Sequence, residues 1–206
     1  MSSRSKGWGI AAAACVGIWL VQNGSEQVTP PVPSAAQAFA AGPNAHTTAA
    51  ADPLPPSAPV RLRVPEIDVD TPMMRLGLDR DGALDVPPAD DRNLAGWYEG
   101  GTSPGAEGTA IVAGHVDNAR GPAVFYALGA LKKGNRVEVD RQDGRTAVFT
   151  IDAVEVYENK DFPDDKVYGE TAGRAEIRVI TCGGGFSKKS GYQGNVVAFG
   201  HLIGVR

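Results

Sequence analysis

The sequence predicts an all-β fold with short helices over residues 60–206, and three observations support this fold class. Glycine and proline contribute 26 and 15 of the 206 residues, and both interrupt helix interiors. Short runs rich in β-branched residues recur between turn residues. Strands do not alternate with long helical segments, so a barrel or a sandwich is expected rather than a parallel α/β sheet.

The expected strands follow one another along the domain with turn residues between them. They cover residues 60–64, 67–69, 109–112, 136–139, 147–157, 175–181 and 195–203. A short helix is expected over residues 123–131 (AVFYALGAL), because Lys132, Lys133 and Gly134 follow it in the manner of a helix end. A second short helix is expected over residues 164–169.

The first 28 residues are interpreted as an N-terminal signal or membrane anchor segment. Arg4 and Lys6 precede an uncharged apolar run over residues 8–21 (WGIAAAACVGIWLV). This run is short for a membrane span, so a cleaved signal peptide is the alternative to an uncleaved anchor. The expected location is the extracytoplasmic face of the membrane, or the exterior if the segment is removed.

Residues 29–59 are predicted to form a disordered linker. Eight prolines, ten alanines and one charged residue, Asp52, fall within these 31 residues. No apolar periodicity is present that could offset the entropy of ordering the chain. The globular domain is therefore expected to begin at residue 60 and to extend to residue 206.

Composition excludes several classes of function. The net charge is −4, and basic residues occur in pairs rather than in clusters, so no nucleic-acid partner is expected. The sequence has no phosphate-binding glycine loop and no Cys-x-x-Cys pair. Its exposed carboxylates lack a metal-ligand spacing, so neither a metal nor a cofactor is predicted.

Cys182 gives the clearest chemical signal. The other cysteine, Cys15, lies in the apolar N-terminal run, so the exported domain has a single thiol and no internal disulfide. Such an unpaired cysteine is unusual in an exported domain. Cys182 follows an expected strand and precedes three glycines, a position that presents side chains at a surface. This setting favours a nucleophile over a small buried hydrophobic residue.

A thiol nucleophile needs a proton partner, and the sequence offers three histidines. His46 lies in the linker and is discounted. His201 lies within the last expected strand, where a structural histidine is the more common case. His115 ends an apolar strand beside a polar loop, so it is the expected partner of Cys182, with His201 as the alternative.

These motifs resemble the sortases, most closely the actinobacterial class F type. The resemblance covers essentially residues 60–206 in the right order. It is carried by residues 64–69 (VPEIDV), 113–117 (AGHVD), 121–125 (GPAVF), 128–137 (LGALKKGNRV), 180–184 (ITCGG) and 195–197 (NVV).

The resemblance implies a closed eight-stranded β-barrel and a cysteine transpeptidase that cleaves an LPXTG-like sorting signal between Thr and Gly. Cys182 falls on the nucleophile of the family and His115 on its general acid. The implied partners are surface proteins that carry the sorting signal, an amine acceptor from a cell-wall precursor or a pilin, and the membrane. The chain is expected to act as a monomer.

The sequence departs from the family at its usual arginine, because no arginine lies between Cys182 and Arg206. Gln193 takes the comparable place and could donate an amide hydrogen to an oxyanion. Thr181, Arg120 and Arg178 are the other candidates for stabilising the oxyanion or positioning substrate. Each of the four could equally be a solvated loop residue or a surface charge.

Two other functions remain open from the sequence. The missing arginine allows a degenerate sortase fold that acts as a binding module. The same cysteine and histidine could also serve an unrelated secreted cysteine hydrolase. Trapping the acyl group of an LPXTG-type peptide on an added amine would separate these possibilities.

Overall fold

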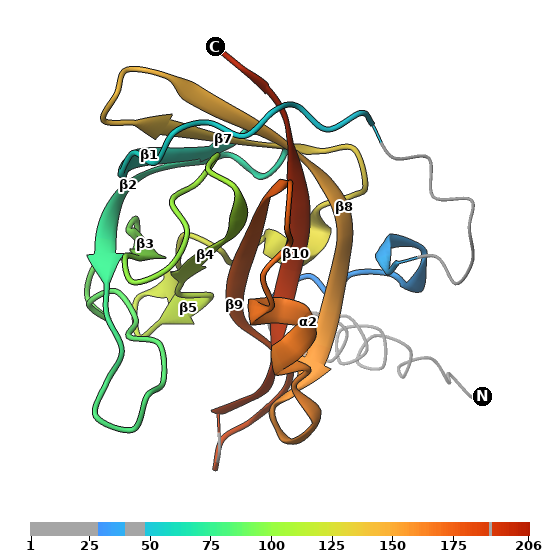
Figure 1. Ribbon diagram of the computed structural model, residues 1–206. Helices are drawn as coiled ribbons and strands as arrows, with labels where there is room; N and C mark the ends of the chain where they lie inside the picture. The colour runs from blue at the N-terminus through green and yellow to red at the C-terminus, as the bar shows by residue number, and fades with distance from the viewer. Residues whose placement is uncertain (1–28, 40–47, 190) are drawn as a thin grey trace, which may run out of the picture.

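The computed structural model describes residues 29–39, 48–189 and 191–206, and it confirms the all-β fold (Figure 1). The predicted anchor over residues 1–28 and the linker histidine His46 lie outside the described residues. Within the described ranges, no helix is long and apolar enough to cross a membrane.

Eight strands close into one barrel with the order β1-β2-β3-β4-β9-β10-β8-β7. Two pairs, β2–β3 and β4–β9, are parallel, and the other neighbours are antiparallel. The barrel strands are β1 (Pro59–Val64), β2 (Val69–Leu76), β3 (Ala95–Tyr98), β4 (Gly108–Gly114), β7 (Arg136–Arg141), β8 (Thr146–Glu158), β9 (Ala175–Ser187) and β10 (Gly191–Val205).

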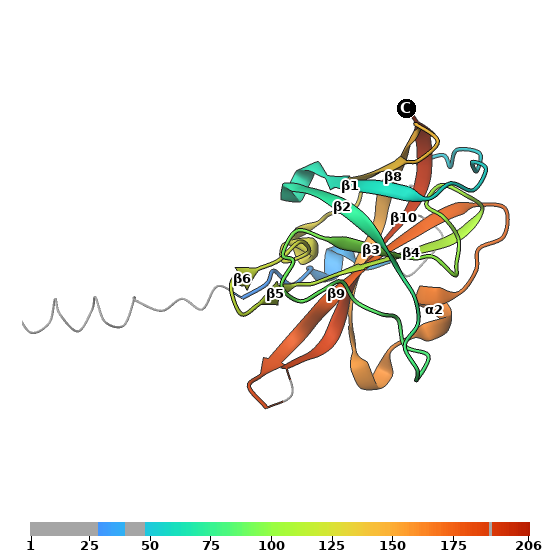
Figure 2. The same cartoon turned by 90° about the vertical axis from the view of Figure 1, so that its left-hand side faces the viewer.

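Small elements decorate the barrel. They include the strand pair β5 (Asp117–Asn118) and β6 (Gly121–Pro122) and the short helix α2 (Asp164–Tyr168), which is labelled in Figure 1. Four 3-10 turns are also present in the described ranges: η1 (Ala35–Gln37), η2 (Pro65–Ile67), η3 (Leu128–Ala130) and η4 (Asn159–Asp161). The β9–β10 hairpin extends beyond the barrel in both views (Figures 1 and 2).

Two apolar clusters lie on opposite faces of the strands. The larger cluster fills the barrel and includes Val112 of β4 and Val179 of β9. The smaller one covers part of the outer face and includes Ile111 of β4, Ile180 of β9 and Val167 of α2. Successive residues of a strand point to opposite faces, so this division assigns the side chains of β4, and those of β9 up to residue 183, to the interior or to the exterior.

The strand and helix predictions need correction in three places. Residues 65–67 form the turn η2, and β2 begins only at Val69, because Asp68 adopts a left-handed conformation with φ of 55°. The strand β3 was not expected. Residues 123–131, expected as a helix, form turns that end in η3, whereas the short helix expected near residue 164 is confirmed as α2.

Residues 48–58, which we call the strap, lie along the barrel. The amide of Ala51 donates to the carbonyl of Leu202 at 2.9 Å, and the amide of Leu54 donates to that of Gly105 at 2.7 Å. The guanidinium of Arg141, whose side chain is fully buried, donates to the carbonyl of Pro55. The strap is therefore packed on the barrel, whereas disorder was predicted for it. Its hydrogen-bond partners come from parts of the barrel that are distant in sequence.

Residues 29–39 also contact the barrel. The Phe39 ring packs edge-on against Phe199 with centroids 5.1 Å apart, and its amide donates to a Glu155 carboxylate oxygen at 2.9 Å. The side chain of Gln37 accepts from the amide of Lys133 at 2.9 Å. The described part of the predicted linker therefore packs on the domain at both of its ends.

Candidate active site

Cys182 and His115 are brought level by the parallel pairing of β4 and β9. Ala113 of β4 is the register partner of Ile180 of β9. His115 and Cys182 each lie two residues beyond that pair, in the same direction along parallel chains. The Thr181 hydroxyl donates to the Gly114 carbonyl at 2.8 Å, which continues the alignment to the residue before each of them.

Both side chains belong to the outer face of the barrel. Ile111 and Ile180 lie in the outer cluster, and His115 and Cys182 follow them by four and two residues respectively. Even spacing along a strand keeps the same face. The thiol is free and exposed, which is the condition for attack on a bound peptide.

The His115 ring is held by the chain between β2 and β3. Its Nε2 lies 2.7 Å from the carbonyl oxygen of Pro87. A carbonyl can only accept, so Nε2 carries a hydrogen and Nδ1 is the nitrogen left to exchange a proton. The same segment fixes the next turn, because the Asn118 side chain donates to the carbonyl of Ala89 at 2.9 Å.

The surroundings of Cys182 favour the neutral thiol. Although the residue is exposed, neighbouring protein atoms shield the thiol in part from water; this desolvation raises the pKa of Cys182, and the negative charge of Asp117 raises it further. A backbone hydrogen bond opposes these effects only in part. The thiolate must therefore form in the presence of substrate and a proton partner, or as a minor species.

The residue that faces Cys182 across the antiparallel ladder is Asn195, not Gln193. Cys182 and Asn195 are direct register partners, and Val197, two residues along β10, belongs to the outer cluster. The Asn195 amide donates to the Asn159 side-chain oxygen at 3.1 Å. An amide donor therefore lies beside the thiol on the same face.

Gln193 lies further along the hairpin because β9 carries an extra residue there. Gly194 pairs with Gly183 and Tyr192 with Phe186, so Gly184 and Gly185 together face Gln193. Gly184 has a φ of 76°, the left-handed conformation that glycine adopts without strain. The Gln193 side chain is exposed and its oxygen lies over Gly185.

The other predicted candidates for stabilising the oxyanion or positioning substrate are not direct cross-strand neighbours of Cys182. They are Thr181, Arg178 and Arg120. The hydroxyl of Thr181 is committed to the carbonyl of Gly114. Arg178 is on the outer face, but it is buried, pairs with Glu176 at 2.7 Å and lies over the Phe199 ring at 4.8 Å. The backbone of Arg120 bonds to Asn118, and its side chain is exposed.

His201 is remote from the thiol. It is the register partner of Glu176, six residues before Cys182 on β9, which is roughly 20 Å along the strand. It is fully buried, with Nδ1 2.8 Å from Asp152 and Nε2 2.9 Å from the Thr48 carbonyl. This is a structural histidine that ties the strap to the barrel.

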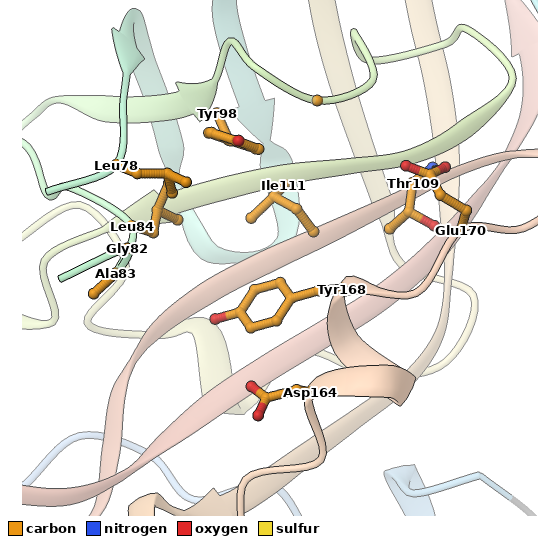
Figure 3. A pocket seen from close by; sticks show the side chains of 11 residues that line it. Leu78, Gly82, Ala83, Leu84, Tyr98, Thr109, Ile111, Asp164, Tyr168 and Glu170 are labelled. Atoms are coloured by element: carbon orange, nitrogen blue, oxygen red, sulfur yellow. The ribbon is translucent and has the colours of Figure 1, made fainter. Parts of the chain in front are cut away.

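A pocket of about 420 Å³ lies on the same outer face, between β4 and α2 (Figure 3). Ile111 and Tyr168 face its interior from β4 and α2. Its far wall comes from the turn between β2 and β3, which contributes Leu78 and Leu84. Ile111 precedes His115 by four residues, so the pocket is roughly 13 Å along the strand from the histidine.

Sequence reasoning did not identify Asn195, Pro87 or the pocket as parts of the site. Asn195 could have been found from the strand pairing, but only if the extra residue in β9 had been placed. The Pro87 carbonyl is a backbone group, so the identity of the residue gives no sign of its role.

Across residues 29–39, 48–189 and 191–206, no group of three or more His, Cys, Asp or Glu side chains could hold a metal ion.

An exposed thiol level with a histidine on the same face is compatible with a cysteine nucleophile and its proton partner. A model of the sortase domain matches residues 62–203 of the chain. Since this is more than half of the sequence, the chain belongs to the sortase family, whose members are cysteine transpeptidases. The predicted resemblance to sortases is thus confirmed at the level of the family.

Solved sortase structures share the fold at low sequence identity. Sortase A of Listeria monocytogenes is 18% identical with a TM-score of 0.54, and the match covers 73% of this chain and 90% of that one. A lid mutant of sortase A from Corynebacterium diphtheriae is 20% identical with a TM-score of 0.55, covering 71% and 70%. Sortase C-1 from Actinomyces oris is 21% identical with a TM-score of 0.52, covering 71% and 75%. No curated protein sequence matches the chain.

Proposed function

We propose that this chain is a class F sortase-type transpeptidase that cleaves an LPXTG-like sorting signal between Thr and Gly and transfers the protein to an amine of the cell wall or of a pilin. The observation that carries the proposal is the alignment of Cys182 and His115 on neighbouring parallel strands, on the exposed face that also holds the pocket. Class F is supported by the sequence motifs that surround the two residues.

In the first half-reaction, the Cys182 sulfur attacks the Thr carbonyl of the sorting signal. A tetrahedral oxyanion forms, and His115 protonates the leaving Gly amine as the C–N bond breaks. The proton comes from Nδ1, since Nε2 donates to Pro87. Because the thiol and the imidazole exchange protons, any pH optimum belongs to the pair.

Asn195 replaces Gln193 as the side-chain donor proposed for the oxyanion. It is the direct cross-strand neighbour of Cys182, and its amide can turn from Asn159 toward a substrate oxygen. A neutral amide supplies one directed hydrogen bond but not the charge of a guanidinium. This predicts a slower acylation than an arginine would support.

The pocket fits the leucine side chain of the sorting signal. An extended peptide rises about 3.3 Å per residue, so Leu lies roughly 10 Å from Thr, which is three residues further on. This is close to the spacing between Ile111 in the pocket and His115 at the strand end. The pocket walls from Leu78, Leu84 and Tyr168 are apolar or aromatic, as a leucine requires.

We further propose that residues 1–28 anchor the enzyme at the extracytoplasmic face of the membrane. The support is the uncharged run over residues 8–21 behind two basic residues. The contacts of residues 29–39 and 48–58 with the barrel would then hold the domain closer to the membrane than a fully disordered tether would.

Mass spectrometry of the chain with an LPXTG peptide tests the enzymatic proposal. The peptide is incubated with and without hydroxylamine, and Cys182→Ala and Asp161→Asn serve as the inactive and surface controls. A hydroxamate that ends at Thr, formed only when Cys182 is present, is the expected product. Hydrolysis without hydroxamate would indicate a cysteine hydrolase, and absence of any Cys182 adduct would indicate a binding module.

A further inference from the structure

Asp117 lies beside the catalytic pair, two residues after His115 in β5. Figures 1 and 2 place β5 next to β9. The Asp117 carboxylate accepts a hydrogen bond of 2.5 Å from the Tyr192 hydroxyl. Tyr192 comes from β10, three residues before Asn195, so this bond joins the histidine turn to the β9–β10 hairpin next to the thiol.

The charge of Asp117 has no cationic partner among the residues that the structure describes. Its Oδ2 accepts from Tyr192, and neither lysine nor arginine in the described ranges forms an ion pair with it. Other half-buried carboxylates of the barrel do have such partners, for example Asp140 with Arg63 at 2.5 Å and Glu176 with Arg178. Asp117 is therefore a half-buried, uncompensated negative charge next to the nucleophile.

We propose that Asp117 binds the ammonium group of the acceptor amine that resolves the thioacyl enzyme. This inference rests on the proposed transpeptidation. A primary alkyl amine has a pKa of about 10.4 and arrives as a cation near neutral pH. Asp117 offers it a carboxylate within the site, and a charge-assisted hydrogen bond from ammonium to carboxylate is among the stronger polar contacts in proteins.

The two half-reactions place opposite demands on this charge. Before acylation, Asp117 opposes formation of the Cys182 thiolate. After acylation, the sulfur is bonded to the Thr carbonyl carbon and carries no charge, so this opposition ends. The carboxylate then acts only on what enters the site, and it attracts cations over water.

The second half-reaction balances with the residues present. The ammonium held by Asp117 transfers one proton to neutral His115 at Nδ1. The free amine attacks the thioester carbon, and a C–N bond forms. The tetrahedral intermediate collapses with cleavage of the C–S bond, and the departing sulfur takes the second nitrogen proton. The products are the amide, the Cys182 thiol and protonated His115.

Asp117→Asn tests the proposal, because Asn keeps the shape and can still accept from Tyr192. Acylation by the LPXTG peptide is measured first, without an acceptor. Aminolysis is then measured with two probes, Nα-acetyl-lysine amide, which is a cation, and hydroxylamine, which is largely neutral near neutral pH. We expect acylation to become faster, because the charge that opposes the thiolate is removed, and the KM for the lysine amide to rise roughly 10- to 100-fold. The KM for hydroxylamine should stay within about twofold.

Two controls separate the charge from its surroundings. Asp161→Asn removes a carboxylate whose side chain is 75% exposed and should change neither step. Tyr192→Phe removes the hydroxyl but keeps the Asp117 charge, so the preference for the lysine amide should persist.

Equal losses with both acceptors, or no change with either, would overturn the acceptor site. Such results would leave Asp117 a structural residue while acylation still supports the proposed function. Failure of the unmodified chain to form any acyl enzyme overturns the transpeptidation itself, and the acceptor site with it. The acylation measurement, made before any acceptor is added, tells the two failures apart.

Discussion

His201 is expected to stabilise the fold in a pH-dependent way. Its Nδ1 lies 2.8 Å from both oxygens of Asp152, and its Nε2 lies 2.9 Å from the Thr48 carbonyl. Both partners accept hydrogen bonds, so both ring nitrogens must donate and the ring is an imidazolium. The hydrogen bond to Asp152 accordingly raises the pKa of His201 above its ordinary value, against the effect of burial.

The magnitude of the stabilisation follows from the burial of the pair. Loss of one partner from a fully buried ion pair costs about 3–5 kcal/mol. The Asp152 side chain is 20% exposed and water can partly replace His201, so His201→Gln should lower the free energy of unfolding by about 2–3 kcal/mol. For a domain of this size, that corresponds to a fall in Tm of roughly 4–12 °C.

The sign of the pH dependence is set by the raised pKa. Protonation stabilises the folded state fully below the unfolded pKa of about 6.5, and the contribution is lost as pH rises through the higher folded pKa. Thermal unfolding of the original chain and of His201→Gln, followed by circular dichroism from acid to alkaline pH, should give Tm curves that converge on the alkaline side. A Tm difference that is absent, or that does not change with pH, would refute the imidazolium assignment.

Three further outcomes are expected. Asn195→Ala should slow acylation of Cys182 by roughly 10²-fold, the effect of losing one oxyanion donor, while Gln193→Ala should stay within about twofold in the same burst assay. Tyr168→Ala should raise the KM for the LPXTG peptide severalfold without changing the rate of resolution by hydroxylamine, as stopped-flow and steady-state assays can show together. Deletion through residue 47 should lower Tm, because it removes the contacts of Pro31 and Phe39 with the barrel. Deletion through residue 58 should lower Tm further, because it also removes the strap; equal Tm values for the two deletions would contradict the role given to the strap.

The strands that could be predicted from the sequence are those whose own residues favour extended structure. The β-branched runs of β4, β8 and β9 were expected at nearly their observed places. Strand β3 (AGWY) has no β-branched residue and forms because β2 and β4 pair with it on both sides. Local propensity cannot report pairing partners that are distant in the chain.

The helix expected over residues 123–131 fails for a tertiary reason. Phe125 is fully buried in the barrel core, and Gly129 packs closely against the carbonyl of Pro31, where a Cβ would leave 1.9 Å. The spacing of apolar residues there reflects contacts with two different parts of the protein rather than one helix face. The packing of the strap could not be predicted for the same reason, because it depends on groups such as Gly105 and Leu202 that are far away in sequence.

The proposed catalytic pair, Cys182 and His115, could be selected from the sequence because both residues end apolar strands, but the groups around them could not. Asn195 depends on the ladder register, and the extra residue at Gly184 and Gly185 shifts that register by one position. Without this shift, the register set by Tyr192 and Phe186 would pair Cys182 with Val196. Gln193 was expected for a different reason, because it takes the place of the family's usual arginine. Asp117 was part of a recognised motif, yet its uncompensated charge becomes evident only when the ion pairs of the other carboxylates are known.

The division of the barrel into an interior and an outer face separates stability from catalysis. The parallel register of β4 and β9 is fixed by backbone hydrogen bonds and by interior residues such as Val112 and Val179, which lie on the face opposite to Cys182 and His115. Cys182 and His115 lie on the other face and at the strand ends, so their removal takes little apolar area from the core. Their alignment therefore does not depend on a bond between them. It depends on the register of the two strands, so substitutions on the interior face that shift this register should misalign Cys182 and His115.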